Sequence, residues 1–169
     1  MFRFELLCAL ALPCSINACT DSSIVAPAAR EVRYSGTVSQ PAGGAFLVYK
    51  ISGVWKVNDK NELISGVDTV NIIDASVYGQ TGTARYVLKT LCASVVGKEA
   101  WAEQEVIETS SPLSAPVGSK GVVHFINVGG VARGAGGPKD ALYPAGNLCA
   151  DKPSGLPVFD MAGGIVVIP

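Results

Sequence analysis

Residues 84–96 read ARYVLKTLCASVV, and the alternation in this stretch decides the fold class. Tyr86, Leu88 and Cys92 fall on one face of an extended chain, because successive side chains of a strand point to opposite sides. Arg85 falls on the other face. The pattern is typical of a strand with one side against a core, and it predicts that the Cys92 thiol points toward that core.

Other segments on both sides have the same character, and turn residues separate them. The predicted strands are residues 31–38, 45–51 with 54–57, 67–77, 84–96, 98–109, 122–128 and 163–168. Residues 98–109 favour a helix by composition, but their apolar residues do not line up at helical spacing, so we predict a strand. Residues 129–148 are rich in glycine and proline, and we predict a long loop there.

About seven strands with no clear helix predict an all-β fold with one domain. We predict an antiparallel β-sandwich, with a small β-barrel as the alternative, since periodicity alone does not separate the two. The predicted domain covers residues 31–169.

The beginning of the chain is typical of an export signal. The apolar run at residues 6–12 is shorter than the roughly 20 residues that span a bilayer. Residues 15–19 (SINAC) resemble the lipobox of bacterial lipoproteins, with an aliphatic residue three places before Cys19 and a small one directly before it. The resemblance implies removal of residues 1–18, attachment of lipid to Cys19 and an outer-membrane destination.

The alternative is ordinary secretion, which would leave Cys19 unmodified in a soluble periplasmic or secreted protein. In either case residues 19–30 are small and polar, and we predict that they form a flexible tether before the domain.

The cysteines fit this compartment. Cys8 and Cys14 belong to the signal peptide, and Cys19 is the predicted lipid site. Cys92 and Cys149 remain as a pair in an oxidising environment, so we predict that they form a disulfide.

Charge and composition argue against several classes of partner. Only 16% of the residues are charged and the net charge is −1, so no basic surface for nucleic acid is expected. The glycines of residues 129–137 superficially resemble a phosphate-binding loop, but the Lys-Ser/Thr pair of a P-loop is missing. We therefore expect no nucleotide and no cofactor.

Few residues suggest chemistry. His124 is the single histidine and lies in the most apolar predicted strand, where a hydrogen-bonded core histidine is the plain interpretation. Asp140 follows glycines and is a weak calcium candidate, but calcium takes six or more oxygens and only Asp151 and Asp160 are obvious further carboxylates. We predict no catalytic residue and no metal site.

Trp101 marks a possible binding surface. On a strand it shares a face with Glu99, Glu103 and Glu105, which could form an acidic patch for a partner. The alternative is that these carboxylates are simply solvated.

From residue 85 onward the chain carries a series of short motifs. They are Cys92, Val95, Gly97 and Ala100, a Ser/Thr-Pro corner at residues 109–112, a strand and glycine loop at 125–137, Pro-x-Asp at 138–140, Cys149 and a closing strand at 164–168. The series resembles an uncharacterised family of small exported bacterial β-proteins. The family's loop usually begins with an acidic stretch, whereas residues 127–131 (NVGGV) carry no carboxylate. The resemblance implies a fold and an export route, and no chemistry.

These observations favour a non-enzymatic, lipid-anchored protein of the cell envelope that acts as a binding or structural module. Its expected partner is the bilayer, through Cys19; a protein or carbohydrate partner is not identified by the sequence. One alternative is an envelope hydrolase with a site around His124. The other is a ligand-carrying barrel with Trp55 or Trp101 at its mouth.

Overall fold

The computed structural model describes residues 29–42, 45–60, 62–74, 83–110 and 115–168. The predicted signal peptide, Cys19 and nearly all of the predicted tether lie outside the described residues. So do the last residues of the strand predicted at 67–77 and part of the Ser/Thr-Pro corner.

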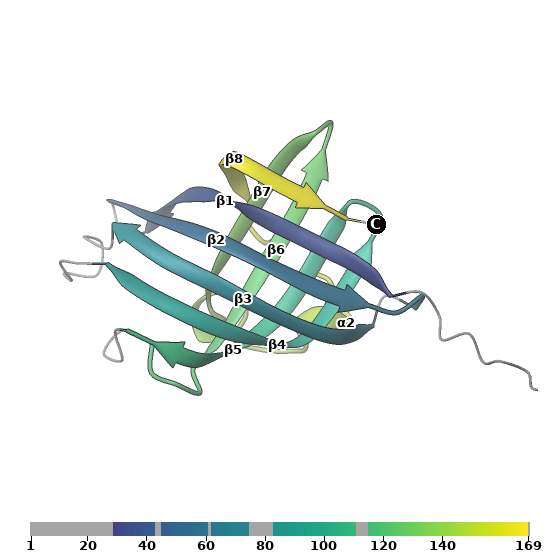
Figure 1. The fold of residues 1–169 in the computed structure, drawn as a ribbon, viewed down its shortest axis with the longest axis horizontal. Coiled ribbons are helices and arrows are strands. Elements are labelled where there is room, and N and C mark those ends of the chain that lie inside the picture. Colours follow the sequence, from purple (N-terminus) through teal and green to yellow (C-terminus); the bar gives the residue numbers. More distant parts are fainter. Residues whose placement is uncertain (1–28, 43–44, 61, 75–82, 111–114, 169) are drawn as a thin grey trace, which may run out of the picture.

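Eight strands form one closed antiparallel barrel in which each strand pairs with its neighbours in the chain (Figure 1). They are β1 (Arg30–Ala42), β2 (Ala45–Val57), β3 (Leu63–Asp74), β4 (Ala84–Val96), β5 (Glu99–Thr109), β6 (Lys120–Val128), β7 (Val131–Pro138) and β8 (Phe159–Val167). Two short helices, α1 (Lys139–Leu142) and α2 (Leu148–Asp151), lie between β7 and β8.

The all-β prediction is confirmed, and the prediction of a sandwich is wrong. β8 returns to pair with β1, with Val167 opposite Arg33 and Met161 opposite Val38, so the sheet closes on itself. Closure pairs both edges of the sheet, and eight strands leave an interior that side chains can fill. The alternative prediction, a small barrel, matches the observed architecture.

The loop predicted at residues 129–148 is also wrong in its first half, which forms β7. The glycines there pack as strand residues against large neighbours on β6. A Cβ on Gly134 would lie 2.7 Å from the Phe125 ring, and one on Gly136 would lie 2.8 Å from the Val123 side chain. These glycines therefore make room for the barrel core.

The strand predicted at residues 98–109 is confirmed as β5, against the helical propensity of its composition. The strand is buried on both sides. Ala100, Ala102 and Gln104 face the barrel interior, and Trp101 and Glu103 face outward but are also buried.

Cys92 does not point toward the barrel core as the alternation predicted. β4 carries a bulge, because its pairing with β5 shifts between Thr90 and Cys92. One extra residue reverses the alternation, so that Thr90 and Ala93 are buried while Leu91 is exposed. Cys92 is opposite Glu103, on the outer face of the barrel.

The centre of the barrel holds three aromatic side chains. The Tyr34 ring stacks on Phe125 with centroids 4.0 Å apart, and it meets Trp55 edge-on at 5.1 Å. Aromatic contacts of this kind add to the free energy gained by burying the rings. The apolar core of the barrel is built around this group.

Candidate functional site

A single carboxylate lies among the aromatic side chains of the core. Asp68 is 1% exposed and belongs to β3. Two strands on each side of β3 each direct one hydrogen-bond donor at Asp68. The donors are the Tyr34 hydroxyl of β1, the Trp55 indole N–H of β2 at 2.9 Å, the Thr90 hydroxyl of β4 at 3.0 Å and the Gln104 amide of β5. We call this group the Asp68 hub.

Two glycines make the hub possible. Gly53 lies between Tyr34 and Asp68 in the register of β1, β2 and β3, and a Cβ there would overlap both side chains. Gly66 is opposite Trp55, and a Cβ there would lie 2.8 Å from the indole ring. The missing side chains let the phenol and the indole lie flat across the sheet.

The electrostatics of the hub follow from its burial. Removal from water raises the pKa of Asp68 from 3.8 to about 6, although the hydrogen bonds from Tyr34, Thr90, Trp55 and Gln104 favour the ionised form and act in the opposite direction. Burial and the nearby carboxylate also raise the pKa of Tyr34. Both carboxylate oxygens of Asp68 already accept protein donors, so the hub ties five consecutive strands together.

Asp68 was not predicted as a site residue from the sequence. A usable signal was present, because Asp68, Val70 and Ile72 share one face of β3, and an aspartate at an inward position of an apolar strand needs partners inside the core.

Residues 139–158, which connect β7 to β8, lie on the outside of the barrel, and we call them the strap. The strap contains α1 and α2 and covers the outer face of β5 and β6. Leu148 is fully buried against Trp101 and Val122, and Leu142 and Leu156 pack beside them. The strap thus completes a small apolar core of its own.

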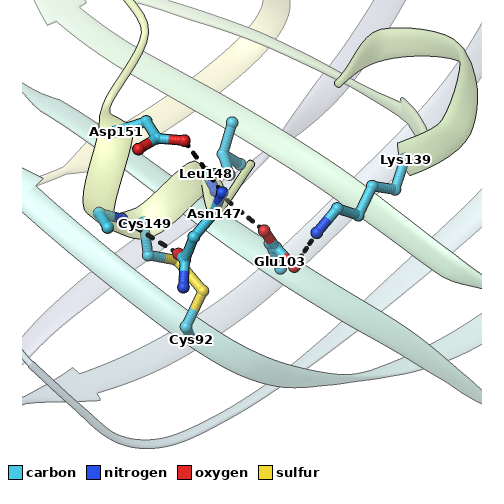
Figure 2. The surroundings of a disulfide bond; sticks show 8 residues. Cys92, Glu103, Lys139, Asn147, Leu148, Cys149 and Asp151 are labelled. Carbon is cyan, nitrogen blue, oxygen red and sulfur yellow. Dashed lines mark hydrogen bonds and ion pairs between the residues drawn. A yellow bond between two sulfur atoms is a disulfide. The ribbon is translucent and has the colours of Figure 1, made fainter. Parts of the chain in front are cut away.

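Glu103 joins two separate points of the strap (Figure 2). One carboxylate oxygen accepts a hydrogen bond from Lys139 Nζ at 2.7 Å, and the other accepts one from the backbone N–H of Leu148 at 2.9 Å. Burial acts to raise the pKa of Glu103, but these hydrogen bonds and the positive charges of Lys139 and Lys120 outweigh it, and the pKa is lowered. Glu103 is therefore ionised near neutral pH.

The predicted disulfide is confirmed. Cys92 and Cys149 are bonded, and the bond connects the outer face of β4 to α2 of the strap (Figure 2). Near it, the Trp101 indole donates to the carbonyl of Pro153 at 3.2 Å. The disulfide, Glu103 and Trp101 hold the strap at several points along its length.

The surface predicted around Trp101 is divided by this arrangement. Trp101 is only 4% exposed, and Glu103 is engaged by the strap. Glu99 and Glu105 are partly exposed, so they are the members of the predicted patch that solvent reaches. The strap of the same chain occupies the rest.

His124 lies beside Trp101 on the outer face of β6 and is also covered. Its ring stacks on the indole at 5.0 Å, and its Nε2 is 3.2 Å from a Glu99 carboxylate oxygen. Burial lowers the pKa of His124 despite the opposing effect of Glu99, so the ring is neutral near neutral pH. Neither neighbour supplies the hydroxyl or thiol of a nucleophile.

The remaining predicted site residues are placed as follows. Asp140 is exposed in α1, and within the described ranges no three His, Cys, Asp or Glu side chains are grouped closely enough to hold a metal ion. Trp55 lies in the core and Trp101 lies under the strap, so neither is at a mouth of the barrel.

The opposite side of the barrel has no such cover in the part of the chain that the structure describes. We call the outer face of β8, β1, β2 and β3 the open wall. Its outward side chains form two rows across the strands. The first row is Val167, Arg33, Val54 and Val67, and the second is Ile165, Ser35, Ser52 and Thr69.

The open wall contains a shallow groove of about 470 Å³. The short side chains of Ser35 and Ser52 form its floor, between Ile165 on β8 and Thr69 on β3. The adjoining row, which is Val167, Arg33, Val54 and Val67, completes the lining. Val54 and Val67 are paired across β2 and β3 and are 41% and 55% exposed, and contiguous exposed aliphatic side chains mark surfaces that bind partners.

Comparison of the chain with protein-family models, with curated proteins and with solved structures found no match. The resemblance to small exported bacterial β-proteins therefore stays a prediction. Among the described residues, no helix has the length and apolar character needed to cross a membrane.

Proposed function

We propose that this chain is an exported, lipid-anchored protein of the cell envelope that binds a protein partner through the groove of the open wall. The groove is the observation that carries the binding role. It combines exposed aliphatic side chains with the hydroxyl groups of Ser35, Ser52 and Thr69, and such a surface suits a partner that offers both apolar side chains and backbone hydrogen-bonding groups.

The dimensions of the groove favour an extended protein segment. Its borders on β8 and β3 are separated by β1 and β2, which corresponds to about 14 Å at the usual spacing between strands. A single extended segment with its side chains fits this width, whereas a small molecule would stay largely exposed in so shallow a depression. The envelope location is supported by residues 15–19 and by the Cys92–Cys149 disulfide.

The other two functions have less support. A ligand-carrying barrel needs space along its axis, where Tyr34, Trp55 and Phe125 are packed against one another. A hydrolase around His124 needs access and a nucleophile, and that ring is buried and stacked on Trp101.

Site-specific photocrosslinking in living cells tests the proposal. A benzophenone amino acid that replaces Ser52 on the groove floor is expected to give an adduct of defined mass, whose partner is identified by mass spectrometry. The matched control replaces Ser154, an exposed serine of the strap. The additional substitution Val67→Asp should abolish the adduct, because it places a charge on the groove border.

Equal crosslinking at Ser52 and Ser154, or an adduct that survives Val67→Asp, would contradict binding in the groove. Intact-mass measurement of the membrane-extracted protein tests the anchor separately, since it reports whether the mature chain begins at a lipid-modified Cys19.

A further inference from the structure

The hairpin between β6 and β7 ends in four residues without charge or polar side chain, Val128-Gly129-Gly130-Val131, which we call the apolar tip. Val128 and Val131 are paired across the strands and are 60% and 51% exposed. Gly129 and Gly130 have φ values of +61° and +83°, and a Cβ at either would meet no atom within 4 Å. The apolar tip therefore projects into open space.

The other described turns at this end of the barrel are different in character. The β2–β3 turn carries Asp59, Lys60 and Glu62. The β4–β5 turn is Gly97-Lys98, next to the exposed Val96, and it adjoins the apolar tip through a 3.0 Å hydrogen bond from the Asn127 N–H to the Lys98 carbonyl.

The position of the apolar tip follows from the topology. In an antiparallel barrel whose strands pair in chain order, β1, β3, β5 and β7 all begin at the same end. The tip directly precedes β7, so by topology it belongs to the same end of the barrel as the start of β1 at Arg30. The residues between Cys19 and Arg30 span at most about 40 Å when fully extended.

We propose that the apolar tip inserts into the surface of the lipid bilayer that carries the anchor, and so orients the barrel on the membrane. The inference rests on the proposed lipid at Cys19, which keeps this end of the barrel near the bilayer. Two exposed valines gain free energy by leaving water, and no charge has to be desolvated, because the tip has none. The open wall, on the side of the barrel, stays accessible to a partner.

Tryptophan fluorescence tests the insertion. The full-length protein is produced with its leader, purified from membranes in lipidated form and reconstituted into vesicles of phosphatidylcholine and phosphatidylglycerol with brominated acyl chains. Trp55 and Trp101 are buried, so a tryptophan introduced by Val131→Trp is the accessible reporter. Its emission is expected to shift to the blue and to be quenched by the bromine atoms.

The matched control is Val117→Trp. Val117 is a valine of similar exposure, 64%, in the β5–β6 connection at the opposite end of the barrel, and its emission should stay unquenched. A second variant, Val128→Ser with Val131→Ser, should increase the rate of transfer of the protein between vesicles about tenfold.

Equal quenching at positions 131 and 117, or no quenching at either, overturns the inference. If the intact-mass measurement shows lipid on Cys19, that result leaves the proposed function unaffected. If the mass shows no lipid, the proposed anchor is wrong. Pelleting of the same protein with vesicles then decides the role of the tip: pelleting that is lost in the double serine variant supports it, and absence of pelleting overturns it.

Discussion

The outward residues are exposed on one side of the barrel and buried on the other. On the open wall, Ser52 and Val54 meet solvent between inward residues of β2. On β5, Trp101 and Glu103 occupy equivalent outward positions but are buried, because the strap covers them. Strand alternation therefore distinguishes the two faces of a strand, whereas a remote segment of the chain determines whether the outer face is exposed.

The disulfide holds the strap over β5, and its removal is expected to give the largest effect on stability. Replacing both of its cysteines (Cys92→Ser with Cys149→Ser) removes a crosslink between residues 57 positions apart. Without the crosslink the unfolded chain regains conformational entropy, so the free energy of unfolding should fall by about 4 kcal/mol. Urea denaturation under oxidising conditions measures this loss.

The same variant should expose one tryptophan only. Trp101 lies under the strap and should become accessible to acrylamide, whereas Trp55 lies inside the barrel and should stay protected. If the two tryptophans respond alike, the strap is not an independent cover, and the contrast between the two walls is lost.

The Asp68 hub lies inside both walls and should give the next largest effect, through pH. The pKa of Asp68 rises from 3.8 in the unfolded chain to about 6 in the folded protein, so the folded state binds the proton more tightly. Its contribution to stability is complete below pH 3.8 and is lost as the pH rises through 6. The loss amounts to at most about 3 kcal/mol.

Asp68→Asn should remove this dependence, because it keeps the shape and removes the titrating group. The test is the difference in unfolding free energy between wild type and variant as a function of pH. The subtraction cancels other groups such as His124, whose lowered pKa gives a slope of the opposite sign. A difference that does not change between pH 4 and pH 6 would mean that Asp68 titrates near its ordinary pKa.

The smallest expected changes in stability come from the same substitution made on each of the two walls. Val122 is 1% exposed under the strap, and Val67 is 55% exposed on the open wall. Val122→Thr places a hydroxyl group among Trp101 and Leu148 and should cost about 2 kcal/mol. Val67→Thr has the same chemistry and should change stability by less than about 0.5 kcal/mol. Thermal unfolding of both variants measures the contrast, and equal losses would show that the open wall is covered in solution.

Much of the strand content could be predicted from the sequence, because alternation is a local property. The β4 strand was found in this way, whereas β5 was predicted because its apolar residues do not line up at helical spacing. The Cys92–Cys149 pair follows from the number of cysteines left in an oxidising compartment. β7 was missed, because its glycines leave space for the side chains of Phe125 and Val123 on β6. This need for space is not visible within residues 131–138.

The sites were harder to predict than the strands. Tyr34, Trp55, Thr90 and Gln104 reach Asp68 from four different strands, and no spacing in the sequence indicates that they meet. The acidic residues around Trp101 were visible as a cluster, but their partner, the strap, is more than thirty residues away in the chain.

By itself the sequence determined that this chain forms strands and that two late cysteines are available to each other, because these properties depend on neighbouring residues and on composition. Only the tertiary structure decided that the sheet closes into a barrel, that a bulge turns Cys92 outward, and that Asp68 gains donors on every side. Closure, register and burial depend on contacts between distant strands, and their free energies are set by packing that exists only in the folded chain.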